Sequence, residues 1–158
     1  MKANKTLRTY KTLKKFPFGE KIFSRIISRI APYFGTISPF ISELRPGHCE
    51  VLIKKKKKVQ NHIGTVHVIA IANGLEMAMG AMAEASIPAH LRWLPKGMTL
   101  DYTAKAGSDI RCVAEVDQNA WQPGDFPVTV TAYDENDVIV VKGFINLWVT
   151  EKPQKPKS

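Results

Sequence analysis

The chain has 158 residues, 44% of them hydrophobic and 23% charged, which is the composition of one ordinary globular domain. Its net charge of +9 is unevenly placed, because residues 1–58 hold 15 Lys/Arg against 3 Asp/Glu whereas residues 59–151 hold 5 against 11. The sequence contains no P-loop, dinucleotide-binding fingerprint or Ser/His/Asp series, so those classes of nucleotide-binding protein and hydrolase are excluded.

The first residues are strongly basic and lack both the apolar stretch and the small-residue cleavage site of a secretory signal. We therefore expect residues 1–18 to form a basic, mobile arm. The sequence Phe16-Pro17-Phe18-Gly19 ends this arm, and an apolar stripe opposite a basic face predicts an amphipathic helix over residues 20–33. The stripe consists of Ile22, Phe23, Ile26, Ile27 and Ile30.

Three roles for this N-terminal third remain open. The helix could cover an edge of a sheet, or its basic and aliphatic faces could make a weak contact with a membrane surface. Binding to nucleic acid is the least favoured role because no recognition motif accompanies the charge, so we predict no nucleic-acid partner.

Six segments have the alternating pattern and the flanking turn residues of strands. They are residues 36–45, 48–58, 89–104, 109–119, 126–135 and 138–150. The second segment ends in the run Lys54–Lys58, which cannot lie in a sheet covered on both faces, so we expect the strand to fray there or to lie at an edge. Contact with the phosphate groups of a ligand, by point charges, is the alternative for these lysines.

The C-terminal residues 152–158 are expected to be a disordered tail, which leaves one domain over residues 19–151. Cys49 and Cys112 fall in expected strands without CxxC spacing. We interpret them as buried free thiols, and this favours a cytoplasmic location.

A long apolar helix separates the second and third expected strands. It follows a polar turn, begins near residues 66–68, runs for about 19 residues and ends at Ser86-Ile87-Pro88. Because it contains His67, Asn73 and Glu76, we exclude a transmembrane span. An unpaired carboxylate inside an apolar helix is costly, so Glu76 is the main catalytic candidate, and pairing with Lys105 is the structural alternative.

The geometry of this helix predicts a dimer. A helix N-terminus offers unpaired N–H groups that polarise a carbonyl, but Glu76 lies eight residues beyond Val68, about 12 Å along the axis. An acid and an N–H donor must both lie within about 3 Å of their targets around one carbon to act together. Two antiparallel helices, one from each subunit, would bring the N-terminus of one level with the acid of the other.

The turn and helix carry the motif Asn61-x-x-Gly64-x-x-His67 with Glu76 following, and this motif resembles that of the hotdog-fold thioesterases. The resemblance is to the subgroup related to the phenylacetate-pathway enzyme, and it covers about residues 20–150. Residues 88–102 look like those of an uncharacterised hotdog subgroup. The implied fold class is α+β, with a curved antiparallel sheet of about six strands wrapped around one long central helix.

The resemblance also implies hydrolysis of an acyl thioester, most simply acyl-CoA, with no cofactor and no metal. The implied assembly is a homodimer, which can pair further into a tetramer. In this scheme Glu76 is the base or nucleophile, Asn61 positions the thioester carbonyl or the water, and the backbone N–H of Val68 holds the oxyanion. Val68 and Ile69 stand where the family has two glycines, which keeps a non-catalytic acyl or acyl-CoA binding module open as the alternative.

Further candidates surround this motif. We expect His67 to be a buried, hydrogen-bonded histidine near the helix start that contributes to catalysis. The substrate-binding candidates are His62, Gly64 and Thr65 in the turn, with Arg92 and Lys96 on a strand.

The remaining histidines carry no functional prediction from the sequence. His48 and His90 are interpreted as loop or strand residues. His48, Cys49, His62 and His67 lack the spacing of metal ligands, so the sequence predicts no metal site.

Overall fold

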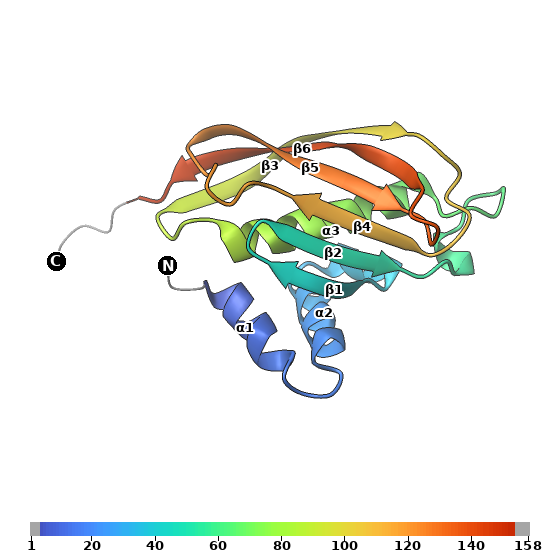
Figure 1. The fold of residues 1–158 in the computed structure, drawn as a ribbon, viewed down its shortest axis with the longest axis horizontal. Helices are drawn as coiled ribbons and strands as arrows, with labels where there is room; N and C mark the ends of the chain where they lie inside the picture. Colours follow the sequence, from blue (N-terminus) through green and yellow to red (C-terminus); the bar gives the residue numbers. More distant parts are fainter. Residues whose placement is uncertain (1–3, 154–158) are drawn as a thin grey trace.

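A six-stranded sheet curves around one long helix in the computed structural model, which describes residues 4–153 (Figure 1). The strands are β1 (Phe40–Arg45), β2 (His48–Ile53), β3 (Leu91–Tyr102), β4 (Ile110–Glu115), β5 (Gly124–Tyr133) and β6 (Ile139–Glu151). Their order in the sheet is β1-β2-β4-β5-β6-β3, and every neighbouring pair is antiparallel. The predicted α+β hotdog fold is therefore confirmed.

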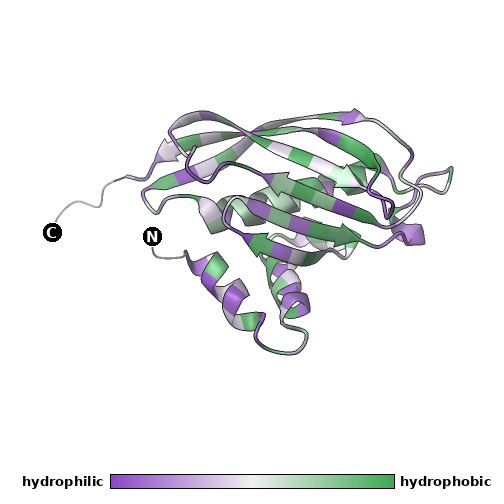
Figure 2. Cartoon of the chain, viewed as in Figure 1, coloured by the Kyte–Doolittle hydropathy of each residue, from purple (hydrophilic) through white to green (hydrophobic). Residues whose placement is uncertain are grey.

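The central helix α3 (Val68–Ser86) begins and ends where the sequence predicts. It contacts all six strands, and hydrophobic residues alternate with polar ones along those strands so that one face of the sheet packs on the helix (Figure 2). A Cβ atom at Gly74 would lie 2.5 Å from Ile53 Cδ1 and 2.9 Å from Cys112 Sγ, so the missing side chain lets α3 approach β2 and β4 closely. The helix is long and apolar enough to cross a membrane, but 61% of it is buried inside the fold, as expected for a core helix.

The expectation of a mobile N-terminal arm is wrong for residues 5–13, which form helix α1 (Lys5–Leu13). Leu7 and Tyr10 lie three residues apart on one helical face and are both buried. The Tyr10 ring meets the ring of Phe23 edge-on with centroids 5.1 Å apart, and its hydroxyl donates a hydrogen bond of 3.3 Å to the Ser42 carbonyl. Residues 1–3 of the expected arm and 154–158 of the expected tail lie outside the described residues.

Two helical segments follow α1 and differ slightly from the expected bounds. Helix α2 (Gly19–Ile30) ends earlier than predicted, because the 3-10 helix η1 (Pro32–Ile37) begins at a proline. This turn replaces the start of the first expected strand. In Figure 1, α1 and α2 project from the β1 side of the sheet.

The lysine run lies outside the sheet, as its charge predicts. Strand β2 ends at Ile53, and Lys57–Val59 forms the short 3-10 helix η2. Lys54 Nζ lies 2.6 Å from the Asp109 carboxylate, which also accepts a 2.8 Å hydrogen bond from the Lys55 backbone N–H. The strand frays here, but it does not lie at an edge, because β2 pairs with both β1 and β4.

Strand β3 forms one edge of the sheet and pairs only with β6. The pairing shifts register between Pro95 and Gly97, at the bend that these residue types predict. The strand is mostly exposed, and two of its large side chains are among the exposed ones: Leu94 is 68% exposed and Tyr102 is 66% exposed. An apolar edge strand of 12 residues is unusually long to be left unpaired in solution.

Candidate functional site

The turn that leads into α3 is closed by the side chain of Asn61. Its Oδ1 accepts hydrogen bonds of 3.1 Å from the N–H groups of Ile63 and Thr65, and its Nδ2 donates one of 2.8 Å to Thr65 Oγ1. Gly64 has φ +79°, a left-handed conformation that favours glycine. Asn61 therefore holds the turn in place, and most of its hydrogen-bonding capacity is used there.

His67 caps the N-terminus of α3. Its Nδ1 accepts a hydrogen bond of 3.1 Å from the Ile69 N–H, so the predicted hydrogen bond at the helix start is present. The predicted burial is wrong, because a capping side chain turns back over the helix end and this ring stays exposed. Among the hydrogen bonds of residues 4–153, none uses the N–H of Val68, which leaves this donor directed out of the helix end.

A concavity of about 310 Å³ lies at this end of the helix. It brings together most of the residues predicted around the motif. The lining includes Asn61, His62, Thr65, His67, Val68, Tyr102 and Lys105. The helix end thus offers one free backbone N–H, a basic residue and two histidines around one hollow.

Glu76 lies in a second concavity, a cleft of about 350 Å³ with mainly apolar walls. Five elements form these walls. Thr6 comes from α1, Ile27 and Ile30 from α2, Ala31 from the residue after α2, Phe34 from η1, Met77, Met79 and Gly80 from α3, and Trp93 and Pro95 from β3. This volume is at the lower end of the range of small-molecule sites.

The Glu76 carboxylate is partly buried and, within residues 4–153, forms no hydrogen bond and no ion pair. The alternative pairing with Lys105 is not found, because Lys105 lines the hollow at the helix start instead. The other acid of this cleft, Glu84, accepts a hydrogen bond of 3.0 Å from Trp93 Nε1. Glu76 is therefore the acid in the cleft that is available to a ligand.

The walls of this cleft were not predicted from the sequence. Ile27 and Ile30 were interpreted as the apolar face of a helix that covers an edge of the sheet or contacts a membrane surface, and no role was predicted for Phe34. The sequence pattern that could have predicted this wall is the apolar stripe of α2. The stripe continues past Ile27 to Ile30, and Ile30 is 76% exposed. An exposed isoleucine beside an apolar cleft indicates a surface that a ligand or a second chain covers.

Two predicted substrate contacts lie apart from both concavities. Arg92 Nε donates a hydrogen bond of 3.0 Å to Thr150 Oγ1. Lys96 Nζ lies 2.6 Å from the Asp125 carboxylate and 5.1 Å from the centre of the Trp148 ring. Both cations are on β3 and are engaged with neighbouring strands.

One chain alone does not bring the acid and the helix end together. Val68 and Glu76 lie in different concavities, separated by two turns of α3. The arrangement has the parts of a site for attack on a carbonyl, but a single subunit holds them too far apart.

The fold of known structures agrees with this description. A structural-genomics protein, APC5556, is 41% identical, with a TM-score of 0.83 over 93% of this chain and 99% of its own. PA5026 of Pseudomonas aeruginosa, described as a protein of unknown function and probable thioesterase, is 18% identical, with a TM-score of 0.76 over 87% and 97% of the two chains. BH2602 of Bacillus halodurans, solved with CoA, is 23% identical, with a TM-score of 0.56 over 64% and 66%.

No curated protein matches the chain. The family model for DUF4442, a domain of unknown function, matches residues 19–149, from the first residue of α2 to near the end of β6. The chain therefore belongs to the DUF4442 family and has the hotdog fold.

Proposed function

We propose that this protein is a cytoplasmic hydrolase of acyl thioesters, with acyl-CoA as the substrate class, and that it works as a homodimer. The observation that carries the proposal is the unpaired carboxylate of Glu76 on the wall of an apolar cleft. A carboxylate in such a place is costly to retain unless it binds or reacts with something. An apolar cleft beside it suits an acyl chain.

The proposed reaction needs only groups of the protein and water. Glu76 accepts a proton from a water molecule as the water oxygen attacks the thioester carbonyl carbon. The negative charge that develops on the carbonyl oxygen is stabilised by the N–H of Val68 at the positive end of α3. The C–S bond then breaks, the leaving thiolate takes the proton that Glu76 accepted, and the carboxylic acid remains.

A second subunit is needed to complete the site, because Val68 and Glu76 of one chain are about 12 Å apart along the helix. The free edge of β3 supports a dimer, since an exposed strand with apolar side chains is a template for pairing with another strand. Ile69, at the start of α3, is 55% exposed and adds apolar surface at the helix end. In this dimer Glu76 of one subunit works with the Val68 N–H of the other.

The names of structural relatives support the class of reaction. PA5026 is described as a probable thioesterase, and BH2602 was solved with CoA. Thioester chemistry and a CoA ligand on the same fold agree with the arrangement of Glu76 and the helix end here.

The test compares wild type with Glu76→Gln on a panel of acyl-CoAs of increasing chain length. Turnover is measured as the release of free thiol from the acyl-CoA. Because a general base contributes about 10²- to 10⁴-fold, we expect kcat of Glu76→Gln to fall by at least about 100-fold while acyl-CoA still binds. Glu151→Gln, the same substitution at an exposed site at the end of β6, is the matched control and should retain full activity.

A non-catalytic acyl-CoA binding module is the second candidate, and the side chains of Val68 and Ile69 favour it. A thioester can approach the helix end closely only if the side chains there are small, whereas Val68 and Ile69 are both bulky. Ile69 is 55% exposed at this end. Binding of acyl-CoA with equal, negligible turnover in wild type and Glu76→Gln would establish the module and rule out the hydrolase.

A further inference from the structure

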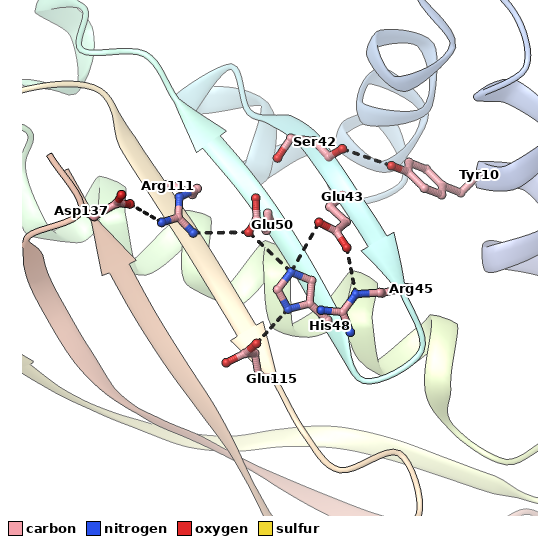
Figure 3. Close-up of polar contacts among 9 residues, drawn as sticks. All are labelled: Tyr10, Ser42, Glu43, Arg45, His48, Glu50, Arg111, Glu115 and Asp137. Atoms are coloured by element: carbon pink, nitrogen blue, oxygen red, sulfur yellow. Dashed lines mark hydrogen bonds and ion pairs between the residues drawn. The ribbon is translucent and has the colours of Figure 1, made fainter. Parts of the chain in front are cut away.

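The outer face of β1, β2 and β4, turned away from α3, carries a cluster of ionisable side chains (Figure 3). In the pairing of β1 with β2, Glu43 lies opposite Glu50 and Arg45 lies opposite His48. In the pairing of β2 with β4, His48 lies opposite Glu115. The strand register therefore places one imidazole among three carboxylates on one surface.

Two of these acids oppose one another without a cation between them. Like charges directly opposite each other on adjacent strands destabilise a sheet. Arg45 Nε binds Glu43 Oε1 at 2.8 Å, and Arg111 Nη1 lies 3.3 Å from Glu50 Oε1, so each arginine lies to one side of the pair. The His48 ring lies beside the two carboxylates, and its Nε2 faces both of them (Figure 3).

His48 is the unusual member of the cluster because its side chain is only 8% exposed although it lies on the outer face. Its Nδ1 lies 2.9 Å from Glu115 Oε1, a hydrogen bond that fixes the ring. Its Nε2 is buried and has no hydrogen-bond partner within the described part of the chain. This atom points toward Glu50 Oε1 at 3.5 Å and Glu43 Oε2 at 3.9 Å.

We infer that His48, Glu43 and Glu50 form a binding site for a divalent transition-metal cation of the Zn²⁺ type. Their ligand atoms, one imidazole nitrogen and two carboxylate oxygens, all lie within 4.8 Å of one another. Zn–N and Zn–O bonds of about 2.0–2.2 Å in a tetrahedron put neighbouring ligand atoms about 3.4 Å apart. His48 Nε2 lies 3.5 Å from the Glu50 carboxylate and 3.9 Å from the Glu43 carboxylate, so both are close to this spacing. Small rotations of the two side chains, which are 20% and 45% exposed, would bring the oxygens into place.

The hydrogen bond to Glu115 is the feature that distinguishes this cluster from a chance group of acids. When Glu115 accepts a hydrogen bond from Nδ1–H, the lone pair of the neutral ring is on Nε2, the atom that faces the two glutamates. Histidines that bind metals commonly have a carboxylate on the other ring nitrogen, which fixes the tautomer and raises the basicity of the ligand. Glu115 is thus a positioning residue, and the fourth position is open to water.

Binding of the cation would neutralise the opposed pair Glu43 and Glu50 and cross-link β1 to β2. This site lies on the face of the sheet opposite to α3 and is separate from the Glu76 cleft. The inference does not depend on the proposed hydrolase activity.

The experiment is titration of metal-stripped full-length protein with Zn²⁺ in a calorimeter, with Co²⁺ absorption as a second probe of ligand geometry. We expect one Zn²⁺ per chain, loss of at least about 100-fold in affinity in His48→Gln and in Glu50→Gln, and about 10- to 100-fold loss in Glu115→Gln. Saturating Zn²⁺ should raise the Tm of the wild type and leave that of His48→Gln unchanged.

The matched control is His90→Gln, which removes an exposed histidine in the segment before β3 and should bind Zn²⁺ as the wild type does. Thermal unfolding without metal shows whether each variant is folded, and Glu50→Gln replaces His48→Gln if the latter is not. The inference is overturned if the wild type binds no Zn²⁺, Co²⁺ or Ni²⁺. It is equally overturned if either His48→Gln or both glutamate variants bind as tightly as the wild type.

Discussion

Cys49 and Cys112 show how strongly the core controls single residues. Both are 0% exposed on the inner faces of β2 and β4. Burial raises the pKa of each thiol well above its ordinary value, because a thiolate would lose its hydration there. The sequence predicts buried free thiols, and the structure confirms them.

This burial makes stability dependent on pH on the alkaline side. The thiol pKa is higher in the folded protein than in the unfolded chain, so its contribution is complete below the unfolded value of about 8.5 and is lost as pH rises above it. We expect the free energy of unfolding to fall above about pH 8.5, by up to about 1.4 kcal/mol per pH unit for each thiol. Urea unfolding at several pH values measures this slope. The double variant Cys49→Ala/Cys112→Ala should have a shallower slope, and an equal slope would contradict the explanation.

His67 and His48 mark the limit of prediction at the scale of single residues. Sequence places His67 at the helix start, but whether its ring enters the core depends on the backbone angles of the cap, here φ −64° and ψ 132°. His48 meets Glu43 and Glu50 only because the β1–β2 register aligns these positions. Neither the cap angles nor the strand register can be read from residue spacing alone.

Among the elements, the α1–α2 hairpin was the least predictable. Its charges dominate the sequence and suggest a solvated arm, whereas Leu7 and Tyr10 form a helical face that is buried only because α2, α3 and β1 provide partners. The connection between the two helices exposes Phe16 at 61% and Phe18 at 71%. Lys21 Nζ lies 5.2 Å from the centre of the Phe18 ring.

We expect this hairpin to bind anionic membrane surfaces. Residues 4–30 hold eight Lys/Arg and one Glu, and each cation near an anionic surface contributes about 1 kcal/mol. The two exposed phenylalanines add apolar area to be buried in the interface. Sedimentation with phosphatidylserine vesicles should show binding that weakens with salt, and Phe16→Ser/Phe18→Ser should weaken it by at least about tenfold.

The control for the vesicle experiment is Val138→Ser, because Val138 is 47% exposed on the turn between β5 and β6, away from the hairpin. It should bind as the wild type does. Equal binding by the phenylalanine variant, or binding to uncharged vesicles that ignores salt, would rule out the hairpin as the contact.

For the whole molecule, the sequence was most informative about architecture. The alternating strands and the one apolar helix predict an α+β fold, because a half-buried strand must cover its apolar face. The wrapping of the sheet around the helix was implied by the resemblance, and the order of the strands was not predicted. The sequence also made Glu76 a candidate site residue, because a carboxylate in the interior of an apolar helix is costly. It could not show the cleft around Glu76, whose walls come from α1, α2, η1, α3 and β3.

The shared site of the proposed dimer can be tested by complementation. Val68→Pro removes the N–H donor at the first helical position, which tolerates proline, and His67 already has the extended angles that a following proline requires. Val68→Pro and Glu76→Gln should each be inactive on acyl-CoA as homodimers. Mixed after unfolding and refolding, they should recover about one quarter of the wild-type activity, because half of the dimers are mixed and each has one intact site.

Light scattering of the same samples serves as the control, since both variants must be dimers for the mixing to be informative. A monomeric wild type would disprove the shared site. Dimeric variants that show no recovery would place all catalytic groups within one chain.

Gly74 affects the position of the Glu76 side chain, two residues later on α3. Successive residues turn by about 100° around a helix, so Gly74 and Glu76 point in nearly opposite directions. Because Gly74 has no side chain, α3 packs close to Ile53 and Cys112. This shift of the helix toward the sheet moves the Glu76 carboxylate in the same direction, away from the opposite side of the helix. The position of the Glu76 carboxylate in its cleft thus depends on a glycine on the opposite side of the helix, which does not line that cleft.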